Sequence, residues 1–349
     1  MKKVTTFLFL TTVIASSSAV ADPFLSLFNP VGLEVVSDNN ILIAHDNVTA
    51  SVVSKFTPNS ELLGSSVIEG VTGINTIGFL AEIPSTGQIL DMLPDGRLLL
   101  LDPISGDTGL VLAMQSIPVD ASAIVDIASG TIDAFEGLIQ TQFSSFGDIA
   151  VFETDNLLDV FVTALSQAQT FPFVVRLRFV DGNFQEAKVL MSSRAEASSG
   201  ASQGVRLTRG IAVNAAGQVL TTLPWTTGPG ILFDALVTFN GDIEPADGIS
   251  ENEFYIVFDE PDIYSSGMTT DSQGNFYVAT NTVGSAALGI PGASLLAVID
   301  PNITTFLGTF TENRLAVSAR DVSVDNARQF AYVSLEDVVV RYPLSGLIQ

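Results

Sequence analysis

The stretch Gly267-Met268-Thr269-Thr270-Asp271-Ser272-Gln273-Gly274-Asn275-Phe276-Tyr277-Val278-Ala279-Thr280 decides the fold class of this chain. It contains a short run of small and apolar residues, then a turn rich in Asp, Asn and Gly, then a second run of aromatic and β-branched residues. Two such runs around Gly-containing turn residues are typical of a β-hairpin. We therefore expect two antiparallel strands here, joined by a tight turn.

The same pattern recurs along the chain. The copies begin at Gly32, Gln88, Gly147, Gly210, Gly267 and Asp321, which lie 54 to 63 residues apart. After most copies another strand pair follows, as at 51–56 and 173–179. Six units of four strands predict an all-β protein, a six-bladed β-propeller of four-stranded antiparallel blades. A β-sandwich is the alternative, but a regular period favours the propeller, because each blade buries its apolar faces only against its neighbours.

The two ends of the chain are expected to meet. The final apolar segment, 338–342, would pair with strand material near the N-terminus such as 24–28, which closes the ring of blades. We therefore treat 22–349 as one domain.

The stretch 267–280 resembles the core of an NHL repeat, in which a glycine and small apolar residues are followed by an aspartate, a Gly-Asn pair and an aromatic-valine-alanine strand. The stretch 210–222 (GIAVNAAGQVLTT) is a second copy, and the other four are degenerate. The resemblance implies a propeller similar to NHL-repeat proteins and to the SMP-30/gluconolactonase group. That architecture hosts lactonases, lyases and pure binding modules, so the resemblance does not imply one activity.

The resemblance also specifies where lactonases of this group hold a divalent cation at the propeller axis. Their asparagine falls here on Arg209, their aspartate on Ser266 and their first glutamate on Gly32. A hard cation requires oxygen ligands. The metal-dependent lactonase is therefore disfavoured, unless the repeats are registered differently.

Composition excludes several other classes. The chain has 38 acidic against 14 basic residues, a net charge of −24, no cysteine and one histidine among its 349 residues. The acid excess argues against nucleic-acid binding. The lack of cysteine excludes disulfides and thiolate chemistry, and a single histidine excludes multi-histidine zinc sites.

The N-terminus predicts export. Met1-Lys2-Lys3 precedes an apolar run over 4–15, and small residues lead to Ala21 before Asp22-Pro23. A basic start, a short apolar run and small residues at the cleavage point are typical of a secretory signal, here 1–21, cut after Ala21. The run is too short for a membrane span. We expect a monomeric protein in a bacterial periplasm or medium, with no integral membrane segment after cleavage.

Two arginines are predicted at the channel. Arg209 and Arg320 each stand immediately before an inner strand and could together clamp a carboxylate, phosphate or enolate. The alternative is that they pair with Asp148, Asp321 or Glu336 and offset the acidic crowding at the axis.

The loops on the same face supply the other candidates. His45 is the one side chain whose unperturbed pKa suits proton transfer near neutrality, although a histidine at a strand end is commonly a rim residue. Asp46 and Asn47 follow His45 directly, and Asn281, in the corresponding loop of another blade, would lie on the same face. Trp225 falls in a turn-dense stretch, 222–230, where an exposed indole could stack on a ring, or could instead pack over the neighbouring blade.

We predict no cofactor. Calcium could bind the acidic clusters at 242–244 and 259–262, but neither has the spacing of an EF-hand loop, and a solvated acidic rim is the simpler interpretation. The leading hypothesis is an NHL-like binding module for a small organic ligand or a protein partner on the channel face. The alternative is an enzyme, a lyase or hydrolase for an anionic or aromatic small molecule, with His45 as base and an arginine stabilising the developing anion.

Overall fold

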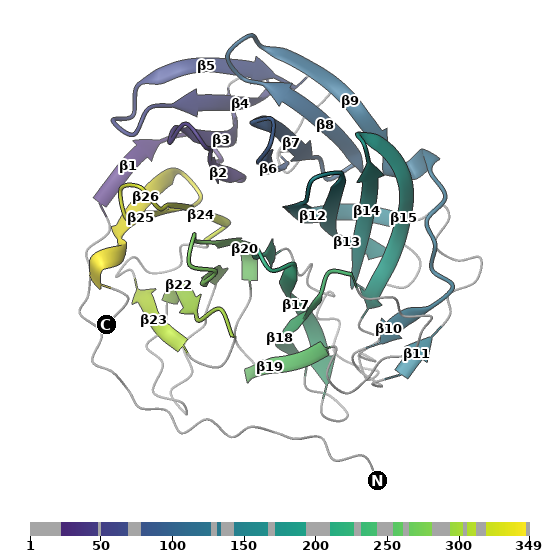
Figure 1. Ribbon diagram of the computed structural model, residues 1–349. Helices are drawn as coiled ribbons and strands as arrows, with labels where there is room; N and C mark the ends of the chain where they lie inside the picture. Colours follow the sequence, from purple (N-terminus) through teal and green to yellow (C-terminus); the bar gives the residue numbers. More distant parts are fainter. Residues whose placement is uncertain are drawn as a thin grey trace.

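The computed structural model is a ring of six β-sheets around a central axis (Figure 1). It describes residues 22–47, 50–68, 78–126, 131–133, 143–166, 172–192, 210–226, 232–242, 254–260, 265–280, 294–302, 306–311 and 319–346. The predicted signal 1–21 lies outside these residues. The all-β six-bladed propeller predicted from the repeat is confirmed.

The blades follow one another along the chain, each running from the axis outward. Blade 1 is β2 (Leu33–Val35), β3 (Ile41–Asp46), β4 (Ser51–Phe56) and β5 (Leu62–Val67). Blade 2 is β6 (Phe79–Ile83), β7 (Gln88–Met92), β8 (Arg97–Asp102) and β9 (Asp107–Ala113). Blade 4 is β16 (Ile211–Val213), β17 (Gln218–Thr226), β18 (Leu232–Asn240) and β19 (Phe254–Glu260). Blade 5 is β20 (Ser265–Thr270), β21 (Phe276–Thr280), β22 (Ser294–Ile299) and β23 (Phe306–Thr311).

Blade 3 departs from the predicted four strands. Its meander is β12 (Phe143–Glu153), β13 (Leu157–Ser166), β14 (Pro172–Val180) and β15 (Asn183–Ser192). The short strands β10 (Ile124–Asp126) and β11 (Thr131–Asp133), from the connection after blade 2, extend it to six strands. Because β10 runs parallel to β15, this blade is not purely antiparallel.

Blade 6 closes the ring as predicted. It consists of β24 (Asp321–Asp325), β25 (Phe330–Ser334) and β26 (Val338–Pro343), with β1 (Asp22–Ser26) as its outermost strand. Strand β1 is antiparallel to β26, with Asp22 opposite Arg341 and Ser26 opposite Val338. Two 3₁₀ turns, Met114–Ser116 and Leu344–Gly346, complete the described elements.

The second predicted repeat is out of step with the others. Gln88 begins β7, the second strand of blade 2, and the inner strand of that blade is β6, which starts at Phe79. The error arises because a Pro-Asp-Gly turn joins β7 to β8, and every hairpin of a blade shows the same strand-turn-strand pattern.

The core lies between the blades. Separate clusters of buried apolar residues fill the contacts of blade 3 with 4, 4 with 5, 5 with 6 and 6 with 1, and one large cluster runs through blades 1, 2 and 3. Inner strands are buried on both faces, as in β24, where all five residues are buried. Burial by neighbouring blades is the physical reason why the units repeat.

Candidate functional site

The channel is narrowed by a ring of six residues, one per blade, that we call the axial ring. Each precedes the first core residue of an inner strand, and the six are Gly32, Gly78, Asp148, Gly210, Gly267 and Asp321. Glycine is needed because the neighbours approach so closely. A Cβ on Gly32 would lie 2.5 Å from the carbonyl oxygen of Gly78, and one on Gly267 would lie 2.0 Å from Oδ1 of Asp321.

The two aspartates of the axial ring bind the backbone of other blades. Asp148 Oδ2 accepts N–H bonds from Ile211 in blade 4 (2.9 Å) and Met268 in blade 5 (3.0 Å). Asp321 Oδ2 accepts the N–H of Leu33 in blade 1 (2.7 Å). These carboxylates therefore join blades around and across the axis, and their hydrogen-bond partners among the described residues are backbone amides rather than the predicted arginines.

Burial at the axis shifts the protonation of these acids. It raises the pKa of Asp148 and of Asp321 well above the usual range, repulsion among the acids adds to the shift, and the N–H donors oppose it. Glu34, on β2, accepts hydrogen bonds from the Glu82 N–H and the Ser323 hydroxyl, and burial raises its pKa to about 8.

Arg320 lies at the mouth of the channel, on the face that carries the β3–β4 loop. Its Nη1 donates to Asn29 Oδ1 and, at 3.4 Å, to the carbonyl oxygen of Pro30. Asn29 Nδ2 in turn donates to Asp46 Oδ2 (2.7 Å), and Asp46 Oδ1 accepts from Ser51 (2.7 Å). The neutral Asn29 amide thus stands between Arg320 and the Asp46 carboxylate, and the structure brings the predicted residues Arg320 and Asp46 into one network.

Arg320 differs in its partners from the other arginines that the structure describes. Each of the others forms an ion pair within 3.0 Å; these are Arg97, Arg176, Arg178, Arg328 and Arg341. For Arg320, Nε and Nη2 have no hydrogen-bond partner among the described residues. Partial burial lowers the pKa of Arg320, while Glu336 and Asp46 act in the opposite direction. The guanidinium therefore keeps donors available at the mouth.

His45 is buried in blade 1 and is joined to this network only through the backbone of Asp46. Its Nδ1 contacts the carbonyl oxygen of Asp46 (3.0 Å) and its Nε2 contacts the Ser54 hydroxyl (2.9 Å). Because a carbonyl only accepts, Nδ1 carries the proton and Nε2 accepts from Ser54. Burial lowers the pKa of His45, which favours the neutral ring. Both ring nitrogens are thus occupied within the blade.

The other predicted site residues are placed as follows. Asn47 is exposed, and its Oδ1 accepts the Ala50 N–H (2.7 Å), which holds the β3–β4 loop. Trp225 lies within β17, opposite Phe233, so the prediction of a loop there was wrong; the Pro224–Trp225 pair continues the strand instead. Arg209 and Asn281 lie outside the described residues.

No metal centre is found in the part of the chain that the structure describes, where no three acidic or histidine side chains gather around a common point. At the positions of the lactonase ligands, Gly32 belongs to the axial ring and Ser266 donates its hydroxyl to the Ala319 carbonyl. In the acidic cluster at 242–244, Asp242 pairs with Arg178 (2.7 Å). These side chains do not fit a resident divalent cation.

Two residues of the mouth were missed in the sequence. Asn29 adopts a left-handed backbone conformation (φ 53°), which asparagine tolerates. It bonds to Arg320, 291 positions away in the sequence, and so links Arg320 to Asp46. Phe28, beside it, is 64% exposed and bridges Asp46 through the backbone. Only the Asn-Pro pair at 29–30 signals a turn there, and no local pattern indicates its distant partners.

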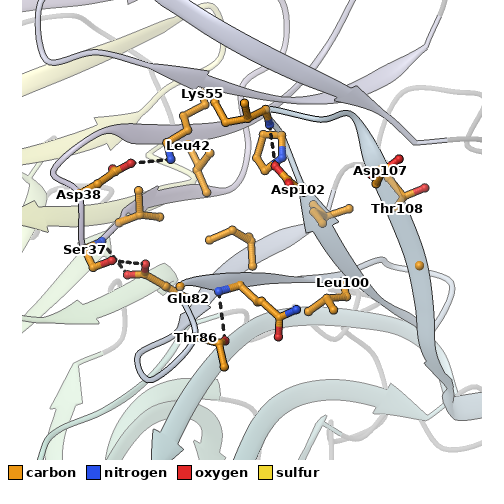
Figure 2. Close-up of a pocket in the computed structure, with 18 residues that line it drawn as sticks. Ser37, Asp38, Leu42, Lys55, Glu82, Thr86, Leu100, Asp102, Asp107 and Thr108 are labelled. Carbon is orange, nitrogen blue, oxygen red and sulfur yellow. Dashed lines mark hydrogen bonds and ion pairs between the residues drawn. The ribbon is translucent and has the colours of Figure 1, made fainter.

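A separate groove of about 660 Å³ opens on the opposite face, between blades 1 and 2. Strand direction places it there, because its walls include the turns after β2, β6 and β8, whereas the β3–β4 loop lies at the other end of the strands. Figure 2 shows Lys55 paired with Asp38 (2.6 Å) and Ser37 bonded to Glu82. Asp102 and Asp107 lie on the side away from Ser37 and Glu82 in this view.

Comparison with known proteins supports the fold. No family model and no curated protein matches the chain. Among solved structures, a candidate gluconolactonase from structural genomics matches with a TM-score of 0.53 at 12% identity, over 94% of this chain and 92% of that chain. The WD40 repeats of RRP9 match with a TM-score of 0.50 at 7% identity, over 94% and 99% of the two chains. The suspected likeness to the SMP-30/gluconolactonase propellers is thus confirmed at the level of fold.

At such low identity these likenesses show the architecture alone. Propellers of this kind carry out unrelated tasks, so the matches select neither an enzyme nor a binding module. Among the described residues, no helix is long and apolar enough to cross a bilayer.

Proposed function

We propose that this chain is an exported binding module whose ligand carries a carboxylate or phosphate group that binds Arg320 at the mouth of the channel. The observation that supports this is the partner set of Arg320, which is held by a neutral asparagine and keeps Nε and Nη2 available. An arginine with two free donors suits a planar anion, because both N–H groups can bond to it side by side.

Phe28 supplies the second half of the proposed site. It is exposed and is joined through the backbone to Asp46, which the Asn29 amide connects to Arg320. An exposed aromatic ring near a cationic group suits a ligand that has both an apolar ring and an acidic group. A small aromatic acid, or an acidic residue next to an aromatic one in a partner protein, fits this description.

The enzyme alternative has less support. Proton transfer would need His45 to reach a ligand, but both of its ring nitrogens are bonded within blade 1. A lactonase of the related group would need oxygen ligands for a cation, and the residues at the corresponding described positions are Gly32 and Ser266. A binding role, in contrast, requires only the available Nε and Nη2 donors of Arg320.

The test is a thermal-shift and titration screen of the mature chain against benzoate, aliphatic carboxylates and inorganic phosphate, with benzamide as the neutral analogue of benzoate. We expect an anion to bind and benzamide not to bind. Arg320→Ala should weaken the binding about 10- to 100-fold, the loss of a charge-assisted pair worth about 1.5–3 kcal/mol. Arg320→Lys keeps the charge but not the planar fork, so its affinity for the anion should lie between those of the unchanged chain and Arg320→Ala.

The control is Arg97→Gln, which removes one positive charge at the β7–β8 turn on the same face, where Arg97 pairs with Asp95 (2.8 Å). If no anion binds, or if Arg97→Gln weakens binding as much as Arg320→Ala, the proposal is wrong. Export is tested separately: N-terminal sequencing of the secreted chain should give Asp22 first.

A further inference from the structure

Among the residues that the structure describes, no strand or loop pairs with the outer edge of β5, the outermost strand of blade 1. Strand β5 (Leu62–Val67) pairs with β4 on one side only, and its sequence LLGSSV has no charged residue and no proline. Natural edge strands commonly carry charged residues or prolines, because these residues discourage another strand from pairing with the edge. Figure 1 shows β5 and β9 on the outer rim of the ring.

Exposed apolar side chains surround this edge. Leu62, Leu63 and Val67 on β5, and Ile104 and Leu110 on the β8–β9 hairpin of blade 2, are 46% to 62% exposed. The hairpin is fixed against β5: a Cβ on Gly64 would lie 2.5 Å from the Pro103 carbonyl oxygen. The Ser66 hydroxyl also donates to the carbonyl oxygen of Asp102 (3.0 Å). We call β5 with these five apolar side chains the β5 edge.

The same hairpin carries two acids, Asp102 and Asp107, that form no ion pair with any described residue. Asp102 and Asp107 are exposed and lie directly opposite each other across β8 and β9. Like charges in a cross-strand pair are destabilising. Hydrogen bonds from the Ser105 and Ile104 N–H groups lower the pKa of Asp102, so that it is charged at neutral pH. The groove that begins here adds Asp38 and Glu82, and its one lysine, Lys55, is paired with Asp38.

We propose that the β5 edge binds an extended, basic segment of a partner protein. The segment adds as a further strand to β5, with main-chain hydrogen bonds along the free edge. Because successive side chains of a strand alternate between faces, apolar residues of the segment pack on Leu63 and Val67 while its lysines or arginines reach Asp102 and Asp107. The positive side chains relieve the repulsion between those two acids.

Charge decides between this partner and a second copy of the chain. Each copy carries a net charge of −24, and pairing two β5 edges would bring two Asp102–Asp107 pairs toward each other. A basic segment is attracted by these acids instead of repelled, and the attraction speeds its approach and fixes its register. The surface is also separate from the channel mouth, which lies at the other end of the blades, so it does not depend on the function of Arg320.

The test uses the full mature chain and two blocked, dye-labelled peptides of equal length, one alternating Lys and Val and one alternating Glu and Val. Fluorescence anisotropy measures their affinity, and hydrogen exchange measures protection of the backbone amides in β5. We expect the Lys-Val peptide to bind and to protect β5, and the Glu-Val peptide not to bind.

Three variants test the contacts. Asp102→Asn with Asp107→Asn should weaken binding of the Lys-Val peptide at least 10-fold. Leu63→Lys, which places a charge on the exposed edge, should abolish protection of β5. Asp155→Asn, the same type of substitution on the exposed β12–β13 turn of blade 3, removes one negative charge away from the β5 edge; it is the control and should have little effect.

Three results would overturn the proposal: equal binding of both peptides, equal loss in Asp155→Asn and in the Asp102/Asp107 variant, or binding that leaves β5 unprotected. Since all substituted side chains are exposed, circular dichroism should show each variant folded, which keeps loss of binding distinct from loss of structure. If the chain instead dimerises through β5, protection of that strand will rise with protein concentration without peptide, and the proposal is again wrong.

Discussion

At the scale of single residues, the packing at the propeller axis depends on glycines that leave room for the side chains of neighbouring aspartates. The Gly267 Cα faces Asp321 so closely that an added Cβ would lie 2.7 Å from the Asp321 Cα as well as 2.0 Å from its carboxylate. The glycine thus makes room for a carboxylate that binds blade 1. Small and acidic residues at the axis are one structural unit.

Gly267→Ala should therefore destabilise the protein strongly. The added methyl meets backbone as well as side chain, so Asp321 must move away from the Leu33 N–H that it accepts. We expect a loss of about 3 kcal/mol or more in the free energy of unfolding, measured by urea denaturation. Gly109→Ala is the control, because its Cβ would meet nothing within 4 Å, and it should change stability by less than about 0.5 kcal/mol. Equal effects of the two substitutions would contradict this account of the axial ring.

The sequence predicts residues of the site unequally. Arg320 and Asp46 could be selected because each stands at a strand end on the channel face, and the structure joins them. Asn29 could not be selected, because its role depends on a contact 291 positions away. His45 stands at the predicted strand end, but its two hydrogen bonds depend on the fold of β4 and on the backbone of Asp46, which no spacing reveals.

At the scale of elements, the seam between β1 and β26 decides whether the ring is closed. Phe24 on β1 is buried against Tyr332 of β25, with ring centroids 5.0 Å apart and planes at 72°. This edge-to-face pair belongs to the cluster between blades 6 and 1. Phe24 is thus a main apolar contact of the closing strand.

Phe24→Ala should lower the free energy of unfolding by about 3–5 kcal/mol, since it leaves a cavity at the seam. Hydrogen exchange should show the loss first in β1 and β26. Phe28→Ala is the matched control, because the same substitution at a side chain 64% exposed should cost little stability. If exchange in β1 and β26 is unchanged in Phe24→Ala, the seam does not depend on this contact.

Elements were predictable wherever the pattern was local. The hairpin at 267–280 was predicted from alternation and composition. Closure was predicted between 338–342 and 24–28, and the structure places the two paired strands at Asp22–Ser26 and Val338–Pro343. The register of blade 2 was not predicted, because the turn after β7 resembles the turn that follows an inner strand. The extra strands β10 and β11 also escaped prediction, since each has only three residues and is held by pairing with β15 rather than by its own pattern.

At the scale of the whole molecule, buried acids set the response to pH. Asp91, on β7 of blade 2, is fully buried with no hydrogen-bond partner on either oxygen, and burial raises its pKa to about 8, as for Glu34. Unfolded carboxyls have pKa values near 4. Between about pH 4 and 8 the folded chain therefore holds protons that the unfolded chain has lost, and stability falls as pH rises through that range.

We expect each such group to contribute a slope of about 1.4 kcal/mol per pH unit within that window. Below about pH 4 the trend reverses, because hydrogen bonds lower the pKa of Asp102 and Asp120 and protonation removes that stabilisation. The maximum should lie on the acidic side of neutrality. Urea denaturation from pH 4 to 9 measures this. Asp91→Asn should flatten the slope, whereas Asp155→Asn should not. A free energy of unfolding that increases steadily from pH 5 to 8 would refute the expected effect of the buried acids.

Closure of the ring through β1 and β26 also constrains the order of folding. Asp22 and Arg341, which pair across the seam at 3.0 Å, are 319 positions apart. During synthesis the N-terminus of the chain emerges first, so β1 has no partner strand while the first five blades form. During that interval β1 could pair with a wrong strand or with another molecule. The charge of Asp22 and the missing N–H of Pro23 discourage such pairing, so these first two residues of β1 protect the nascent chain until its last strand arrives.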